Sequence, residues 1–394
     1  MNKRPIKLAL YLAAVIIITA AVLLLSGRTK ASGGNPVSDS KSVENTAAGR
    51  SEEIAATTSI EEANGMPVYG KWRTFTTKDG LPSDHAYTVR IFGNRVLAGT
   101  HDGLAVYENG KWRTYTTKDG LSHNGVVSVD YSEMTGDIWI GTLGGLTRWS
   151  GDKFEVFNQF NSGMPNDLVY NVVCDGKDVW VATAGGAGRY DTFKKEWEIF
   201  TELNAPMHEP WTYALSEGDG KIFIAAWGGG VIEYNKATKR FRDYTDPDGF
   251  MEIDLQPDDG VVHDITTATA WANGTLWVST YFGMSSYDGK NWKGFFDHDS
   301  GLASNFINFL RAKGRVALVC CDNGFSTTDG KTWVTYKKND NDANGKAIIT
   351  SGKDKKEIPL SPSISNNFII GVDAKDNYVW LATSKGVCRG ELMK

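Results

Sequence analysis

The sequence is poor in cysteine and has no excess of positive charge. Its 394 residues include only 4 cysteines, which form no C-x-x-C pair, no C-x-x-C-H haem attachment and no spacing typical of zinc ligands. Lysine plus arginine number 42 against 47 aspartate plus glutamate, for a formal net charge of -5. The sequence therefore excludes a disulfide-built or haem-bearing protein. It also argues against a nucleic-acid partner, because proteins that bind nucleic acid usually carry a basic patch.

Glycine and aromatic residues are abundant. The chain has 43 Gly, 13 Trp, 15 Tyr and 17 Phe. Aromatic residues favour pleated sheet, and glycine supplies the tight turns between strands. The composition therefore indicates many short strands rather than helices.

The N-terminus carries the one long apolar run of the sequence. Lys3, Arg4 and Lys7 precede a run without charged residues from Leu8 to Leu25, which is long enough to span a bilayer. No small-x-small cleavage site follows it, so we expect an uncleaved signal-anchor helix within residues 1–30. The positive charges before the span place the N-terminus in the cytoplasm and the rest of the chain outside it. Residues 31–65 are too polar to form a packed core and are expected to be a disordered linker.

Internal repeats decide the fold of residues 66–394. The stretch Gly70–Leu81 recurs almost unchanged as Gly110–Leu121. A second signature, typified by Trp-Ile-Gly-Thr, follows each copy and occurs seven times, at Leu97–Thr100, Trp139–Thr142, Trp180–Thr183, Phe223–Ala226, Trp277–Thr280, Leu318–Cys321 and Trp380–Thr383. The period is about forty residues, which is the length of a four-stranded propeller blade. The sequence therefore predicts an all-β, seven-bladed β-propeller.

One repeat predicts the strands of a whole blade. We expect an inner strand at Val126–Asp130, then strands at Trp139–Thr142, Leu146–Trp149 and Lys153–Phe157. The last repeat stops after its third strand, and the first begins with an unpartnered outer strand from 70 to 76. We expect the two ends to complete one blade and so close the ring, because closure removes the free sheet edges.

The repeats resemble a known family. The sequence Gly-Leu-Pro-Ser at 80–83 and the pattern Trp-Ile-Gly-Thr-x-x-Gly-Leu-x-x-Trp at 139–149 are similar to the two-component-regulator propeller repeat. This resemblance covers about 68–394 and implies the periplasmic ligand-binding sensor domain of hybrid two-component systems. The sequence lacks the second propeller, β-sandwich and histidine kinase of those systems. We therefore expect a sensor or scaffold module without its own kinase.

All six histidines fall in segments that the topology places on one face. They are His85, His101, His123, His208, His263 and His298. The long connections Thr201–Trp211, Thr245–Val262 and Lys337–Asn367 lie on the same face, and function commonly resides in such loops. His101, His208 and His263 are candidate ligand-binding residues. The alternative function is a metal-assisted lyase or lactonase, with carboxylates such as Asp84, Asp102, Glu209, Asp264 and Asp322 completing the site.

Aromatic residues on this face are the second group of candidates. Trp211, Trp227, Tyr281 and Phe282 could stack on a sugar or anchor a partner, or pack between neighbouring blades. Nine other tryptophans recur at fixed repeat positions and are expected in the core, namely Trp72, Trp112, Trp139, Trp180, Trp197, Trp277, Trp292, Trp333 and Trp380.

One motif in the longest insertion suggests calcium. Asp340, Asp342 and Asn344 match the first half of a calcium loop, but Ser351 stands where a bidentate glutamate is expected. They can equally be ordinary polar residues of an insertion.

Together these features predict an extracytoplasmic propeller on a single-pass membrane anchor, facing the periplasm or the exterior. Its expected partners are an envelope protein or a glycan or other small-molecule ligand, and the membrane through the N-terminal helix. A fold of this kind hosts many functions, so the choice between binding and catalysis depends on the site.

Overall fold

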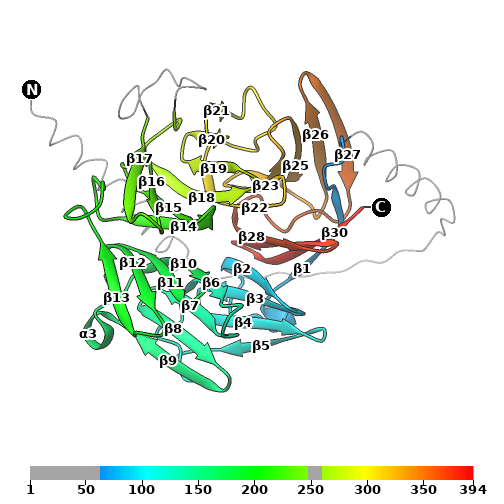
Figure 1. Ribbon diagram of the computed structural model, residues 1–394. Coiled ribbons are helices and arrows are strands. Elements are labelled where there is room, and N and C mark those ends of the chain that lie inside the picture. Colours follow the sequence, from blue (N-terminus) through cyan, green and yellow to red (C-terminus); the bar gives the residue numbers. More distant parts are fainter. Residues whose placement is uncertain (1–62, 247–259, 394) are drawn as a thin grey trace, which may run out of the picture. The chain divides into compact units, whose positions relative to one another are not determined.

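The computed structural model describes residues 63–246 and 260–393. In this part of the chain the strands form seven antiparallel sheets, and the first strand of each sheet contacts the first strands of its two neighbours. The last of these strands, β28, contacts the first, β2, so the sheets form the ring seen in Figure 1. The all-β, seven-bladed propeller that the repeats predict is confirmed.

The first four blades each contain four strands, which follow one another from the central channel outwards. Blade one consists of β2 (Ala86–Phe92), β3 (Arg95–Thr100), β4 (Gly103–Glu108) and β5 (Lys111–Tyr115). Blade two consists of β6 (Val126–Tyr131), β7 (Ile138–Thr142), β8 (Gly145–Ser150) and β9 (Lys153–Phe157). Blade three consists of β10 (Val169–Asp175), β11 (Asp178–Thr183), β12 (Gly186–Asp191) and β13 (Glu196–Phe200). Blade four consists of β14 (Thr212–Gly218), β15 (Lys221–Ala226), β16 (Val231–Asn235) and β17 (Arg240–Tyr244).

The other three blades include the irregular ones. Blade five consists of β18 (Thr266–Ala272), β19 (Thr275–Thr280), β20 (Gly283–Tyr287) and β21 (Trp292–Phe295). Blade six has six strands, β22 (Ile307–Lys313), β23 (Val316–Cys321), β24 (Gly324–Thr328), β25 (Thr332–Lys338), β26 (Gly345–Ser351) and β27 (Asp354–Leu360). Blade seven consists of β28 (Ile369–Lys375), β29 (Tyr378–Thr383), β30 (Gly386–Leu392) and, outermost, β1 (Tyr69–Phe75). Two short helices, η1 (Thr77–Asp79) and α3 (Gln159–Ser162), follow outer strands.

The repeated signature explains why each blade turns where it does. Thr142, the last residue of β7, donates its hydroxyl proton to the carbonyl oxygen of Gly145 at 2.7 Å. Gly145 has a φ of 120°, a conformation that side chains with a Cβ rarely adopt. A Cβ there would also lie 2.6 Å from the carbonyl oxygen of Phe157 in β9. Threonine and glycine at this spacing therefore fix the tight turn between the second and third strands.

Blade seven is built from both ends of the described chain. β1 pairs antiparallel with β30, with Thr74 opposite Cys388 and Phe75 opposite Val387. Figure 1 shows the blue β1 beside the red β30. That this pairing is what holds the ring closed stays a prediction, which truncation of β1 can test.

Packing begins earlier than the expected start of the propeller. Ala63 is fully buried in a cluster shared by blades six and seven, and the Asn64 amide donates to the Thr332 hydroxyl at 3.2 Å. At least three residues assigned to the linker thus contact the propeller, because Arg315 also donates to the Gly65 carbonyl at 3.2 Å.

The predicted membrane helix lies outside the described residues. Among residues 63–246 and 260–393, no helix is long and apolar enough to cross a membrane.

The insertion after β25 is not the loop that the sequence analysis expected. Its residues form the hairpin β26–β27, which extends blade six outwards through pairing of β25 with β26. The alternation of Ala347 and Ile349, which are buried, with more exposed neighbours is a strand pattern that the expectation overlooked. This hairpin lengthens the outer edge of the blade rather than covering the channel.

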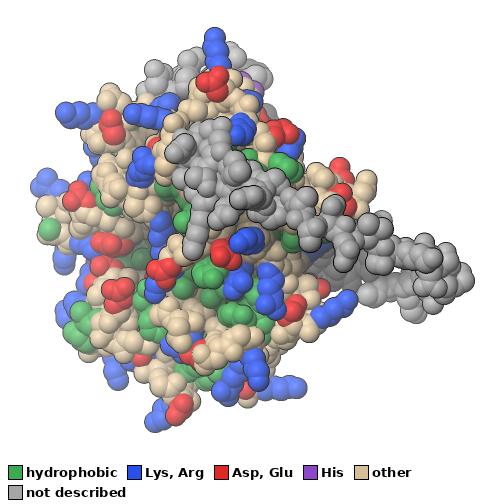
Figure 2. All heavy atoms as spheres, turned by 90° about the vertical axis from the view of Figure 1, so that its right-hand side faces the viewer, with side chains coloured by type: hydrophobic (Ala, Val, Ile, Leu, Met, Phe, Trp, Pro, Cys, Tyr) green, Lys and Arg blue, Asp and Glu red, His purple; other side chains and the backbone are tan. Residues whose placement is uncertain are grey.

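The recurring tryptophans pack as expected at six of nine positions. Trp72, Trp139, Trp180, Trp277, Trp333 and Trp380 are at most 4% exposed. The expectation is wrong for Trp112, Trp197 and Trp292, which are only partly buried. They lie on outer strands that no further strand covers, whereas Trp333, on β25, is covered by β26. Trp72 also lies on an outermost strand, β1, but is buried against Tyr336 of blade six. On the face that Figure 2 presents, basic side chains are interspersed with acidic ones.

Candidate functional site

Every inner strand carries the same irregularity near its start. The register of each first strand shifts by one residue after its first pair, as between Ala86 and Thr88 in β2 and between Thr212 and Ala214 in β14. The extra residue of each bulge stands at the channel mouth, and in three blades it is a tyrosine, namely Tyr87, Tyr170 and Tyr213. Bulges of this kind commonly re-aim a side chain toward a site.

Aromatic side chains form a continuous series around this mouth across blades three to six. We call the residues Tyr170, Tyr213, Trp227, Tyr281 and Phe306, with Trp211, the aromatic arc. Consecutive ring centroids lie 5.4 Å apart for Tyr170 and Tyr213, and 5.6 Å apart for Tyr213 and Trp227. The series continues at 6.0 Å from Trp227 to Tyr281, whose ring stacks on Phe306 at 4.4 Å.

The arc combines apolar ring surface with the hydroxyl groups of its tyrosines. Trp211, Tyr213 and Tyr281 are half-buried, whereas Trp227 is 9% exposed and lies edge-on to Trp211 at 6.4 Å. Burial raises the pKa of Tyr281 to about 12 and raises that of Tyr170 as well, so both hydroxyls are protonated at neutral pH. Rings that are partly covered and held by neighbours can stack on a ligand with little loss of side-chain entropy.

The structure brings three of the four predicted aromatic residues together. Trp211, Trp227 and Tyr281 belong to the arc. Phe282, 36% exposed, instead stacks on His263 at a centroid distance of 4.2 Å. His263 itself is 1% exposed, and its Nδ1 accepts a hydrogen bond from the Ile265 amide at 3.0 Å. Burial lowers the pKa of His263 to about 4, so it is a neutral packing residue at neutral pH.

The remaining histidines do not converge on one site, although His85 and His101 both contact Tyr87. His101 lies in blade one, where its Nδ1 is 3.2 Å from the Tyr87 hydroxyl, and Tyr87 also packs against His85 at 4.8 Å. His208 lies in blade four, exposed, near Asp264. In the described part of the chain, no three His, Cys, Asp or Glu side chains lie close enough together to hold a metal ion. The lyase or lactonase alternative therefore has no ligand set among these residues.

Two of the candidate carboxylates serve as clips between blades. Oδ1 of Asp84 accepts the Thr77 amide at 2.6 Å, and its carbonyl oxygen accepts the amide of Gly386 from blade seven. Asp264 accepts the Asp246 amide at 2.9 Å in the same manner. Aspartate or asparagine occupies the equivalent position in six of the seven connections and makes the same hydrogen bond, namely Asp84, Asn124, Asp167, Asp264, Asn305 and Asn367. Sequence reasoning could have found this clip from its constant place two residues before the inner strand.

The predicted calcium residues lie in the turn between β25 and β26. Oδ1 of Asp342 accepts the Asn344 amide at 2.7 Å, and the Asn344 side chain accepts the Ser361 hydroxyl at 2.6 Å. The Lys338 ammonium group donates to the carbonyl oxygens of Asn339 and Asp342. The ammonium group of Lys338 thus already binds carbonyl oxygens of this turn that a metal ion could use. Calcium binding by Asp340, Asp342 and Asn344 stays a prediction.

Sequence reasoning missed a group of charged residues inside the channel. Arg90 Nε lies 2.8 Å from Asp130 Oδ1, and its Nη1 lies 3.1 Å from Asp373 Oδ2. Lys313 Nζ also lies 3.3 Å from Asp373. Burial opposes the charge on Arg90, but the two carboxylates outweigh it and raise its pKa. The signal in the sequence was a charged residue at one fixed position of otherwise apolar inner strands.

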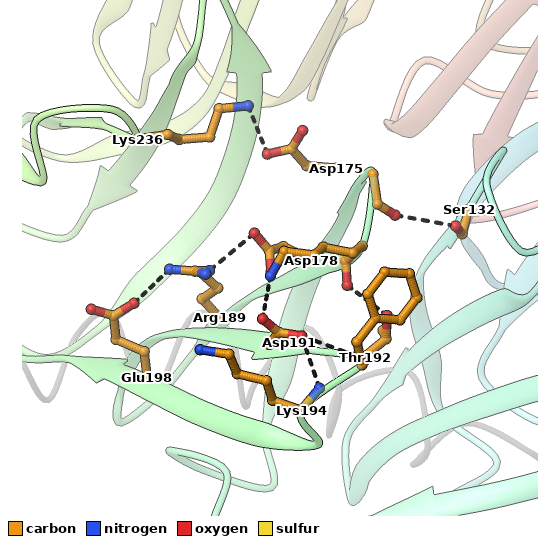
Figure 3. A network of polar contacts seen from close by, with 12 residues as sticks. Ser132, Asp175, Asp178, Arg189, Asp191, Thr192, Lys194, Glu198 and Lys236 are labelled. Carbon is orange, nitrogen blue, oxygen red and sulfur yellow. Dashed lines mark hydrogen bonds and ion pairs between the residues drawn. The ribbon is translucent and has the colours of Figure 1, made fainter.

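A second charged network lies at the opposite ends of blades three and four. Figure 3 shows Lys236 reaching Asp175, at 2.7 Å, and Arg189 between Asp178, at 3.1 Å, and Glu198, at 2.8 Å. Each of these cations has a carboxylate partner. The network therefore ties turns of the two blades together.

Comparisons with known proteins add the fold but no family. No family model matches the chain, and no curated protein matches it. The family resemblance of the repeats therefore stands on the motifs alone.

Solved structures with the same fold are distant in sequence. The extracellular domain of a putative hybrid two component system from B. thetaiotaomicron is 16% identical with a TM-score of 0.63, covering 82% of this chain and 42% of that one. A second such domain from the same organism is 15% identical with a TM-score of 0.61, covering 82% and 40%. Virginiamycin B lyase from Staphylococcus aureus is 11% identical with a TM-score of 0.58, covering 82% and 99%. The chain thus spans less than half the length of the two extracellular domains, and at these identities the likeness shows the fold alone.

Proposed function

We propose that this chain is an extracytoplasmic binding module, a sensor or scaffold held at the membrane by its N-terminal helix. The ligand or partner binds over the channel mouth, against the aromatic arc. The likeness to extracellular domains of two-component systems and the repeat motifs both support a sensor or scaffold role. Signalling would pass through a separate membrane partner.

The observation that carries the proposal is the uneven distribution of aromatic residues around a symmetric ring. Bulge positions are structurally equivalent in all blades, yet Tyr170 and Tyr213 are adjacent and continue into Trp227 and Tyr281. The bulge residue of blade two is Val127 and that of blade seven is Ile370. The bulge position therefore accepts aliphatic residues as well, and this supports recognition as the role of the aromatic rings. Partly buried aromatic residues commonly supply most of the binding energy of an interface.

The test compares two half-buried tryptophans. The full-length chain in detergent is applied to an array of bacterial envelope glycans, and proximity cross-linking in intact cells reports envelope proteins. Trp211→Ala should weaken the binding found by at least about tenfold, because truncated aromatic anchors typically cost that much. Trp292→Ala, on the outer strand of blade five, should leave it unchanged. Binding that is equal in the two variants would place the site elsewhere.

Location is tested separately. Added protease should digest the propeller in cells with a permeabilised outer layer but an intact inner membrane. Protection of the propeller under these conditions would contradict the proposed side of the membrane.

A further inference from the structure

The inner strands also enclose a cavity of about 230 Å³ deeper in the channel. Its lining includes Arg311, Ala270, Trp271, Phe309 and Ser216, together with the charged residues Arg90, Asp130 and Glu217, each of which has an ion-pair partner. Its lining begins at Asn171, directly after the bulge residue Tyr170, and extends to Glu217, four residues beyond the bulge residue Tyr213. No residue of the aromatic arc lines it. The cavity is therefore distinct from the surface used by the proposed function.

The register of the blades shows that one arginine in this channel, Arg90, has a carboxylate partner on each side. Arg90, Asp130 and Asp373 occupy the same position of three adjacent inner strands, each opposite the first residue of the repeated signature. Arg90 bonds to Asp130 on one side and to Asp373 on the other. A channel arginine at this position thus takes one carboxylate from each neighbouring blade.

Arg311 occupies the same position in β22, but no carboxylate of the described residues pairs with it. Its neighbour in blade seven, Asp373, already bonds to Arg90 and Lys313. Its neighbour in blade five is Ala270, at the position where a carboxylate would complete the pattern. In the described part of the chain, no carboxylate oxygen lies within 4.0 Å of Arg311, and its Nε donates to the Val372 carbonyl at 3.2 Å.

A buried guanidinium group that no carboxylate contacts is a favourable position for binding an anion. A buried charge that no carboxylate contacts directly costs free energy. Burial and the nearby charge of Arg90 both lower the pKa of Arg311, and the attraction of Asp373 and Asp130 does not offset them. The planar fork of arginine matches a carboxylate, with two parallel hydrogen bonds.

We propose that this cavity binds a small organic carboxylate, whose carboxylate group lies between Arg311 and Ala270 and whose organic part packs toward Trp271 and Phe309. The cavity volume falls below the usual range of about 300–1,000 Å³ for ligand pockets, so the ligand is small. Glu217 at the rim bonds to Lys236 at 3.1 Å and does not neutralise Arg311. The site is independent of the aromatic arc.

The probe is benzoate, with benzamide as its uncharged counterpart. Binding to the full-length chain in detergent is measured by saturation-transfer NMR and calorimetry. Benzoate should bind saturably, and benzamide at least about tenfold more weakly, because the charge-assisted bond is lost. Absence of saturable benzoate binding, or equal binding of the two probes, would overturn the proposal.

Two variants locate the site. Arg311→Gln removes the charge, and Ala270→Asp supplies the missing carboxylate from the chain, as Asp373 does for Arg90. Each should weaken benzoate binding at least about tenfold. Ala270→Ser and Arg113→Gln, an exposed arginine on the outer strand of blade one, should not change it, and neither should Trp211→Ala. If Arg311→Gln does not fold, Ala270→Asp still decides, because unchanged affinity in that variant would overturn the proposal.

Discussion

The guanidinium group of Arg90, in the first blade, lies 3.1 Å from the carboxylate of Asp373, in the last. The two residues are 283 positions apart, and Asp373 is fully buried on its side chain. An ion pair in the channel therefore joins the first and last blades of the ring. Burial of Asp373 favours its neutral form, but Arg311, Arg90 and Lys313 outweigh this and lower its pKa.

Removing Arg90 should cost far more stability than removing an exposed arginine. Arg90→Met leaves Asp130 and Asp373 without their shared partner, and we expect the free energy of unfolding to fall by about 3 to 5 kcal/mol. Arg73→Met is the control, because Arg73 is exposed and lies 3.9 Å from Asp79, a pair worth at most about 1 kcal/mol. Urea unfolding of both variants checks this, and similar losses would show that the channel pair is not special.

Removal of β1 should open the ring. A chain that begins at residue 61 keeps Ala63 and all of blade seven, and we expect it to be folded and soluble. A chain that begins at residue 78 loses Trp72 and Phe75, which are 3% and 1% exposed, and their burial alone is worth more than about 5 kcal/mol. Thermal unfolding of the two proteins measures the difference. Equal midpoints would mean that β1 does not close the propeller.

Stability should depend on pH through His263. Burial lowers its pKa from the ordinary 6.5 to about 4, so the unfolded chain binds the proton more readily than the folded one. The contribution of His263 to the free energy of unfolding is fully present above pH 6.5. It falls by roughly 3 kcal/mol as the pH decreases from about 6.5 to about 4. His263→Asn keeps an acceptor for the Ile265 amide and should lose this pH dependence. His298→Asn, at an exposed site, should retain it, and the comparison is made by urea unfolding at several pH values.

The interblade clip should tolerate asparagine but not alanine. Asp84→Asn preserves the acceptor for the Thr77 amide, as Asn124 and Asn305 do at equivalent positions. Asp84→Ala removes it and should lower the free energy of unfolding by about 1 kcal/mol. Thermal unfolding with and without a chelator checks both this loss and the structural role. A chelator-dependent midpoint in the parent protein that is absent in Asp84→Ala would instead indicate that Asp84 is a metal ligand.

Much of the fold was predictable because each repeat specifies its strands and turns through residues that are close together in the sequence. The threonine and glycine of each signature act within one turn, and Lys153–Phe157 forms the strand expected of it without any change of bounds. The hairpin β26–β27 escaped prediction because its pairing occurs once and has no second copy for comparison. Three of the recurring tryptophans were misplaced because burial depends on which strand covers the outer edge, and a repeat pattern does not show that.

The sequence by itself determined the number of blades, since periodic turns and alternating apolar residues specify each sheet separately. It also marked Trp211, Trp227 and Tyr281 as candidates, although not that their rings meet. Only the tertiary structure decided which residues share the channel, because Arg90, Asp130, Arg311 and Asp373 become neighbours through the closure of seven blades. That closure pairs Arg90 with two carboxylates and leaves Arg311 beside an alanine.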